Sequence, residues 1–416
     1  MSRFAGTWLL LLFIILLDFY VFQALKSISA QWSSKTVRWV FIFYWIISFF
    51  SIGFMLTIVF TSFESWHKLL RTYLFATIIG LFLAKFLSGV FFLIDDLRRA
   101  FQYVGSWWVP GWKKEVDNGG ISRSVFISWM GLVTGGGLFT SLLYGFGNKY
   151  KYTVRKISLH FPNLPASFKG YRIVHISDIH SGSFTDAAAV QKGIDLINRQ
   201  NPDLILFTGD LVNYQAAEME PYISMFQQLS AKNGIYATLG NHDYGFPKNG
   251  DVVDLKSLHL SNAKAVEEIH QRLGWTLLRN AHVQLQNQND SIAIIGVENI
   301  SAKVGFPSYG KLKDAYSGAE PIPFKILMTH DPSHWNAEVT TGFTDIDLTL
   351  SGHTHGMQFG VELPGFRWSP VKYVYKQWAG LYESGLQKLY VNRGFGFIGY
   401  PGRVGILPEI SVIELI

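Results

Sequence analysis

Residues 171–180 read Tyr-Arg-Ile-Val-His-Ile-Ser-Asp-Ile-His, an apolar run that ends in a carboxylate and an imidazole two positions apart. The run predicts a β-strand over residues 171–177. Alternate residues of an extended chain point to the same side, so Asp178 and His180 can hold one ion together. This stretch predicts a sheet with ligand chemistry at the end of a strand.

Four further motifs place ligand-type side chains after short apolar runs. They are Gly209-Asp210, Gly240-Asn241-His242-Asp243, His330, and Gly352-His353-Thr354-His355. With the first motif, the set holds three carboxylates, one amide and five imidazoles. One such residue is ordinarily part of a turn or a core, but five motifs in order after strands indicate two divalent metals. Paired metals are suited to attack on phosphate esters.

The same half of the chain alternates short apolar runs with amphipathic stretches. The predicted strands are 171–177, 204–208, 235–239, 291–297, 324–329, 347–350, 388–392 and 409–415. Residues 186–199 have helical spacing, and residues 145–165 are predicted to be a connection. Buried strands separated by helices favour an α/β sandwich over residues 151–416.

The first 150 residues have a different composition. Four apolar stretches, near 5–25, 38–61, 72–94 and 125–144, are each about 20 residues long, enough to cross a bilayer. The first could instead be a secretory signal, but three more spans follow it. We therefore predict a multi-pass transmembrane domain of about four helices over residues 1–150, in a cell or inner membrane.

Charged and aromatic residues near these spans carry further predictions. Asp18, Lys85, Asp95 and Asp96 are expected at the interface or snorkelling toward it, with an intramembrane role as the alternative. The loop 96–121, rich in Trp and Lys, is expected to be re-entrant or to lie on the membrane surface.

Charge and cysteine content exclude several classes of function. The chain carries a net charge of +6, with 13 basic and 6 acidic side chains in residues 1–150 and 23 and 24 in residues 151–416. The basic half suits anionic lipid head groups, and the near-neutral half argues against nucleic acid as a partner. The absence of cysteine excludes disulfides and thiol catalysis.

The orientation in the membrane is predicted from the basic residues that flank the spans. These residues divide almost evenly between the two sides of the membrane, and the cluster after the fourth span favours a cytoplasmic catalytic domain.

The five motifs resemble the signature of the calcineurin-like metallophosphoesterase superfamily, over about residues 171–416. Its membrane-linked branch is similar in two further blocks, Gly352-His-Thr-His-Gly-Met357-Gln and Arg403-Val-Gly-Ile-Leu-Pro-Glu409-Ile. Met357 stands where that branch usually has glycine, which puts the shape of the pocket wall in question. The resemblance implies a four-layer α/β/β/α sandwich.

The resemblance also implies two metal positions that share one carboxylate. The residues implied at the first are Asp178, His180, Asp210 and His355. The residues implied at the second are Asp210, Asn241, His330 and His353. The metals are expected to be Mn²⁺, with Fe, Zn²⁺ or Mg²⁺ as alternatives.

Three other residues have implied roles in catalysis. His242 is expected to donate a proton to the leaving oxygen while a hydroxide between the metals attacks phosphorus. Asp243 is expected to orient His242, or else to cap a turn. Arg403 is a candidate contact for a substrate phosphate, with a salt bridge to Glu409 or another acid as the alternative.

Membrane spans and a phosphoesterase signature together predict a lipid substrate. The related branch includes enzymes that resemble UDP-2,3-diacylglucosamine pyrophosphate hydrolases of lipid A synthesis. We expect hydrolysis of a phosphoester or pyrophosphate in a lipid or a lipid-linked sugar nucleotide. The alternatives are a general phosphodiesterase or phosphatase that is merely anchored, and a membrane sensor without turnover.

Overall fold

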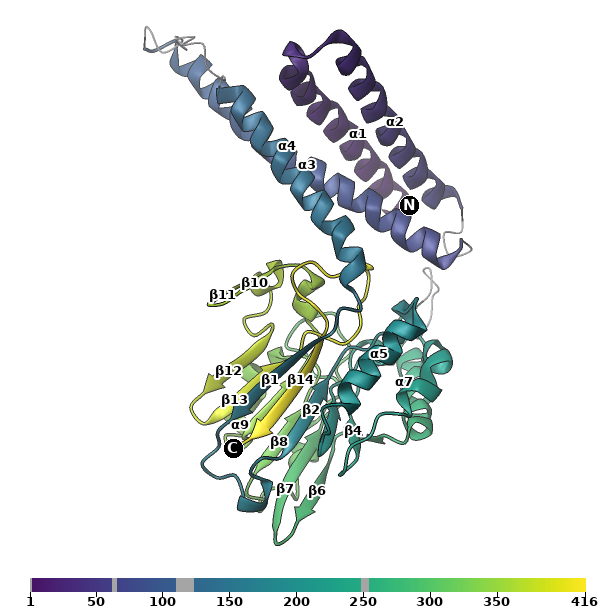
Figure 1. Ribbon diagram of the computed structural model, residues 1–416, viewed down its shortest axis with the longest axis vertical. Helices are drawn as coiled ribbons and strands as arrows, with labels where there is room; N and C mark the ends of the chain where they lie inside the picture. The colour runs from purple at the N-terminus through teal and green to yellow at the C-terminus, as the bar shows by residue number, and fades with distance from the viewer. Residues whose placement is uncertain (1, 62–65, 110–122, 248–253) are drawn as a thin grey trace. The chain divides into compact units, whose positions relative to one another are not determined.

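Four long helices make up the first of the two units into which the chain divides, residues 1–144 and 145–416. The computed structural model describes residues 2–61, 66–109, 123–247 and 254–416 (Figure 1). The long helices are α1 Ser2–Ile28, α2 Ser34–Phe60, α3 Lys68–Gly105 and α4 Arg123–Gly145. All four are long and apolar enough to cross a membrane, as the sequence predicted.

Helix α3 is longer than the predicted third span. The prediction of a loop from residue 96 is wrong at its start, because residues 96–105 continue the helix. Asp95 pairs with Arg98 at 2.9 Å and with Arg99 at 3.2 Å, at spacings of three and four residues that support helical structure. Residues 110–121 of that predicted loop lie outside the described residues.

Asp18 and Lys85 occupy the interior of the helical unit, so the prediction of interfacial or snorkelling positions is wrong for this pair. Asp18 on α1 is fully buried, and its Oδ1 lies 2.5 Å from Nζ of Lys85 on α3. The same ammonium donates to Ser48 Oγ on α2 at 2.9 Å. Polar contacts therefore join three helices.

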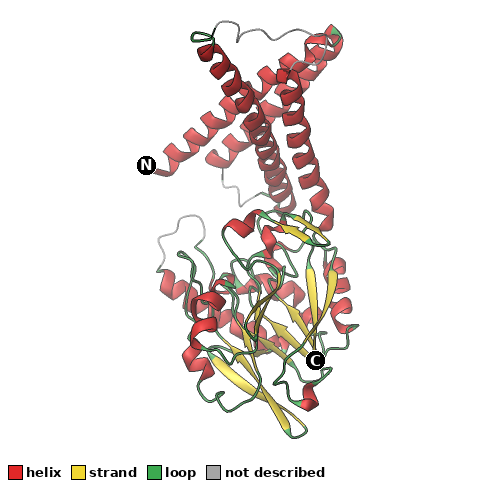
Figure 2. Cartoon of the chain, turned by 90° about the vertical axis from the view of Figure 1, so that its left-hand side faces the viewer, coloured by secondary structure: helices red, strands yellow, loops and turns green. Residues whose placement is uncertain are grey.

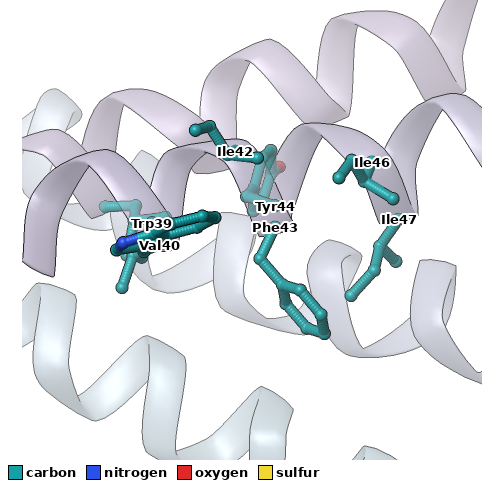
Figure 3. Close-up of a pocket in the computed structure, with 8 residues that line it drawn as sticks. Trp39, Val40, Ile42, Phe43, Tyr44, Ile46 and Ile47 are labelled. Carbon is teal, nitrogen blue, oxygen red and sulfur yellow. The ribbon is translucent and has the colours of Figure 1, made fainter.

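An apolar hollow lies along α2. It is lined by Leu25 of α1 and by side chains between Trp39 and Ile47, which Figure 3 shows as sticks. Because these residues fall within the second span, we expect hydrocarbon chains of lipid to fill the hollow.

The second unit contains two six-stranded sheets (Figure 2). The first sheet has the order β1-β14-β2-β3-β4-β5, with β14 antiparallel to β2 and the other pairs parallel. Its strands are β1 Thr153–Leu159, β2 Arg172–Ile176, β3 Leu204–Phe207, β4 Ile235–Ala237, β5 Thr276–Leu277 and β14 Glu409–Leu415. Strand β1 lies within residues 145–165, so the prediction of a connection there is wrong for residues 153–159.

The second sheet has the order β12-β13-β9-β8-β7-β6, with a parallel centre and antiparallel pairs at both edges. Its strands are β6 Ala281–Asn287, β7 Asp290–Gly296, β8 Lys325–Met328, β9 Leu348–Ser351, β12 Gly380–Ser384 and β13 Gln387–Val391. A separate hairpin pairs β10 Val361–Leu363 with β11 Phe366–Trp368.

Alternation along the strands produces four layers. Ile173 of β2 packs into the core between the sheets, and its neighbour Val174 packs on the outer side with residues of α5 Ala187–Asn198 and α7 Leu255–Leu273. On the other side of the sandwich, Ile295 of β7 packs with α8 Leu312–Tyr316. The shorter helices are α6 Ile223–Phe226 and α9 Thr340–Gly342. The predicted α/β sandwich is confirmed.

Candidate metal centre

The ligand-type side chains gather where the central parallel strands of both sheets end. Each predicted motif directly follows β2, β3, β4, β8 or β9. Carboxyl ends of parallel strands meet at one edge of a sheet, and stacking two sheets brings two such edges together. The five motifs, which are separate in the sequence, therefore lie together at one site.

The backbone at this edge is strained. Five of the predicted metal ligands have positive φ angles between 48° and 70°: Asp178, His180, Asp210, His353 and His355. A left-handed conformation is uncommon for residues other than glycine, and it is concentrated at functional sites. Gly209 has φ +90°, and a side chain there would collide with the backbone of Gly240, so the close approach of these two loops requires glycine.

The first group of ligand atoms surrounds Asp178. His355 Nε2 lies 3.2 Å from Asp178 Oδ1 and 3.0 Å from His180 Nε2. His180 Nε2 is 3.5 Å from Asp210 Oδ2. All four side chains are buried, and ligand atoms of Asp178, His180 and His355 lie within 4.8 Å of one another.

The second group shares Asp210 with the first. His330 Nε2 lies 3.1 Å from Asp210 Oδ2 and 3.3 Å from His353 Nδ1. His353 Nδ1 is 2.8 Å from the amide oxygen Asn241 Oδ1. Asp178 also lies near both groups, with Oδ1 at 3.9 Å from Nε2 of His180 and from Nε2 of His330. The structure thus brings together every residue predicted as a metal ligand.

Hydrogen bonds outside the groups set the orientation of the rings. His330 Nδ1 donates to the carbonyl of Thr208 at 2.8 Å, and His180 Nδ1 donates to that of Val212 at 3.2 Å. A ring that donates from Nδ1 keeps the lone pair of Nε2 for the site.

The charges at the centre fit divalent cations. Burial alone would lower the pKa of His330, but the carboxylates of Asp210 and Asp178 raise it to about 10. Burial lowers the pKa of His180, so its ring presents a neutral nitrogen. Two buried carboxylates favour positive charge between them, and the mixture of carboxylate, amide and imidazole donors suits transition-metal dications.

His242 lies beside the first group without joining it. Its Nδ1 donates to the carbonyl of Asn213 at 2.7 Å, and its ring centroid is 4.9 Å from that of His180. Nε2 makes no hydrogen bond with the residues that the structure describes. The ring of Phe246 packs at 4.9 Å from the His242 ring, and Tyr214 follows at 6.3 Å from Phe246, so aromatic side chains border this end of the site.

Asp243 does not orient the imidazole of His242, which corrects the predicted catalytic role. Its buried carboxylate accepts the backbone N–H groups of Asp210 and Gly240 at 2.9 Å and that of Leu211 at 2.8 Å. Asp243 therefore holds the loops after β3 and β4 together.

Arg403 is fully buried beneath the ligands, so its position does not support the predicted contact with substrate. Its guanidinium donates to the carbonyls of Arg393 at 2.7 Å and Gly396, and Nη2 lies 3.2 Å from His355 Nδ1. The alternative of a salt bridge to Glu409 is also corrected, because Glu409 pairs with Arg393 at 2.5 Å. Arg403 braces the loop behind His355.

Two residues that the sequence did not single out complete the surroundings of His353. Its Nε2 lies 2.8 Å from the hydroxyl of Tyr375 and 3.7 Å from Asp331 Oδ2, and the hydroxyl donates to that carboxylate at 3.3 Å. Asp331 directly follows the predicted ligand His330, and this adjacency in the sequence could have indicated that it lies near the site. Tyr375 comes 22 residues after its partner, and no local pattern indicates it.

Both halves of the chain match family models. The model described as "Calcineurin-like phosphoesterase" matches residues 171–357. The model described as "Probable Calcineurin-like phosphoesterase, transmembrane domain" matches residues 2–148.

Individual relatives match between 58% and 71% of the chain. The Bacillus subtilis (strain 168) metallophosphoesterase YkuE is 31% identical, over 71% of this chain and 98% of its own length. The zebrafish (Danio rerio) "Transmembrane protein with metallophosphoesterase domain" is 28% identical over 62% of this chain, which spans 56% of that relative. The UDP-2,3-diacylglucosamine pyrophosphatase LpxG of Chlamydia trachomatis serovar D is 28% identical, over 58% of this chain and 83% of its own.

Proposed function

Since this chain belongs to the calcineurin-like phosphoesterase family and carries four helices that can span a membrane, we propose that it is a membrane-bound, metal-dependent phosphoesterase. The observation that carries the proposal is the pair of ligand groups that share Asp210, with the free nitrogen of His242 beside them.

Two divalent ions held there would supply an activated water and offset the negative charge of a phosphate. The chain's own residues hold the geometry. The backbone N–H of His242 donates to Asp210 Oδ1 at 2.8 Å, which leaves Oδ2 directed at both His180 and His330. The shared carboxylate is thereby fixed between the two groups.

His242 is placed to protonate the leaving oxygen. The carbonyl of Asn213 accepts the proton of Nδ1 and so fixes the orientation of the ring. When the ring carries a second proton, on Nε2, that proton can pass to the leaving oxygen of a bound substrate. General acid catalysis of this kind contributes roughly 10² to 10⁴ in rate.

The proposed substrate is a phosphoester or pyrophosphate in a membrane lipid or a lipid-linked sugar nucleotide, similar to UDP-2,3-diacylglucosamine. The membrane spans and the name of the chlamydial relative support it. The aromatic border at Phe246 and Tyr214 offers an apolar surface beside the leaving group. The second candidate is a general phosphodiesterase for which the helices serve as an anchor.

Further parts of the proposal concern the metal and the membrane. Mn²⁺ is the proposed metal, because imidazole, amide and carboxylate donors together suit it. A cytoplasmic catalytic unit and four crossings of the bilayer are the proposed arrangement. The cysteine-free chain allows a test by single introduced cysteines and a membrane-impermeant maleimide in intact cells.

The decisive experiment compares two substrates on the intact protein. Detergent-purified chain loaded with Mn²⁺ is assayed with UDP-2,3-diacylglucosamine and with bis-p-nitrophenyl phosphate, beside His242→Ala. The matched control is His160→Ala, which removes an exposed imidazole that follows β1.

The lipid proposal would be supported if the parent and His160→Ala hydrolyse the lipid and His242→Ala hydrolyses it at a rate lower by a factor of roughly 10² or more. Cleavage of the soluble diester alone would favour the second candidate. If metal-loaded protein cleaved neither compound nor other phosphorylated lipids, the chain would instead fit a membrane sensor.

A further inference from the structure

The β10–β11 hairpin exposes its apolar residues, while its charged residues Glu362 and Arg367 contact other residues of the unit, although Arg367 is itself exposed. Leu363 pairs with Phe366 and Glu362 pairs with Arg367 in the antiparallel register. Residues that are directly opposite share a face, so the hairpin has one apolar and one charged face. Leu363 is 63% exposed and Phe366 is 56% exposed, the reverse of the pattern expected for a hairpin in water.

Contacts on the charged face hold the hairpin in this orientation. Glu362 pairs with Arg393 and also with Arg155, which lies at 2.6 Å. Arg367 donates to the carbonyl of Ala379 and stacks over the ring of Trp378 at 5.3 Å. The apolar face therefore cannot turn inward without breaking these contacts.

The exposed surface continues beyond the hairpin. Trp368 Nε1 donates to the hydroxyl of Tyr373 at 3.5 Å, and Tyr373 is itself 74% exposed. We use the name hairpin surface for the exposed apolar residues of this segment. They are Met357, Val361, Leu363, Phe366, Tyr373 and Val374.

The hairpin surface adjoins the metal centre at both of its ends. Met357 is the second residue after the ligand His355. At the other end, Val374 precedes Tyr375, whose hydroxyl lies 2.8 Å from Nε2 of the ligand His353. A molecule lying on this surface is therefore next to the reacting site.

We propose that the hairpin surface inserts into the surface of a lipid bilayer that contains anionic lipids. Contiguous exposed apolar residues mark interaction sites, and aromatic side chains such as Phe366 and Tyr373 are favoured at a membrane interface. The exposed Lys372 and Lys376 complement anionic head groups. A chain that carries membrane-spanning helices keeps this unit within reach of a bilayer.

Insertion would deliver lipid directly to the metal centre. This consequence rests on the proposed function, whereas the insertion itself does not. A phosphorylated lipid could leave the bilayer along the hairpin surface and place its phosphate at the ligands, so that its acyl chains never cross water.

The test places a reporter on the hairpin surface of the full chain. Because the chain lacks cysteine, Phe366→Cys and Leu386→Cys each give a single labelling site for an NBD fluorophore. Leu386 is the matched control, since it is an apolar residue, 74% exposed, in the turn between β12 and β13. The labelled proteins are reconstituted in vesicles of phosphatidylcholine with phosphatidylglycerol, with and without doxyl-labelled lipid.

We expect blue-shifted emission at position 366 and loss of roughly half its intensity to doxyl lipid, with no change at position 386. Equal quenching at both positions, or none at 366, would overturn the proposal. A blue shift in detergent that grows with protein concentration would assign the surface to a second copy of the chain, and would also overturn it.

An activity measurement separates this inference from the proposed function. Leu363→Ser with Phe366→Ser should lower cleavage of lipid in vesicles several-fold and leave cleavage of bis-p-nitrophenyl phosphate unchanged. Equal loss on both substrates would contradict lipid delivery. If the parent cleaves no lipid, the proposed function fails, and quenching at 366 alone still decides the insertion.

Discussion

Removing the ammonium of Lys85 should destabilise the helical unit strongly. Lys85→Met keeps a side chain of similar length but leaves the carboxylate of Asp18 without its partner at 2.5 Å. Asp18 is fully buried and Lys85 is 7% exposed, so solvent cannot replace the lost contact. Breaking a buried ion pair by removing one partner costs about 3–5 kcal/mol. The contact with Ser48 is lost as well, which places the expected loss toward the upper part of that range.

A double-mutant cycle isolates the pair. Asp18→Asn together with Lys85→Met removes both charges. The loss of unfolding free energy in the double variant should therefore be smaller than the sum of the two single losses, by about 0.5–3 kcal/mol. The free energy of unfolding is measured by denaturing-detergent titration in mixed micelles, followed by circular dichroism. Lys35→Met, an exposed lysine in the first turn of α2, is the control and should change stability by less than about 0.5 kcal/mol. A loss for Lys85→Met as small as that of the control, or strict additivity in the cycle, would refute the reasoning.

Three predictions concern the metal centre. Gly352→Ala should abolish the thermal stabilisation by Mn²⁺, because a Cβ there would overlap Ser177 Oγ; a stabilisation equal to that of the parent would contradict this. Tyr375→Phe keeps the ring but removes the hydroxyl next to His353 Nε2, and we expect a loss of about 10- to 100-fold in Mn²⁺ affinity by calorimetry. Unchanged affinity would show that the hydroxyl does not support the ligand. Below its raised pKa, His330 of the metal-free site binds a proton that competes with metal, so Mn²⁺ affinity should rise from about pH 6 to about pH 8. Calorimetry in two buffers of different ionisation enthalpy should reveal the released proton, and identical heats would count against it.

Much of the architecture was predictable because its signals are local. A short apolar run with a polar residue at its end indicates a strand and the position of its terminus, so the motif around Asp178 was correctly placed after β2. The order of such runs indicated a sandwich. Apolar stretches of about 20 residues likewise indicated the long helices. Strand β1 was not predicted because most of its residues are half-buried or exposed and because it carries no motif.

Roles that depend on distant partners were not predictable. Asp243 follows His242 in sequence, yet its carboxylate binds the backbone of Asp210 and Leu211 from another loop. Arg403 was expected to contact a substrate phosphate. Only the packed structure shows that it is buried and that it contacts the loop behind His355 through hydrogen bonds.

The sequence by itself determined that ligand-type side chains follow strands, and that four stretches within the first 150 residues are apolar enough for a membrane. These properties follow from residue type and periodicity, which each segment carries alone. The tertiary structure decided that Tyr375 supports His353, that Asp18 meets Lys85, and that the β10–β11 hairpin turns its apolar face outward. Such contacts join residues distant in sequence, and their free energies arise from burial and charge that exist only after the elements have packed.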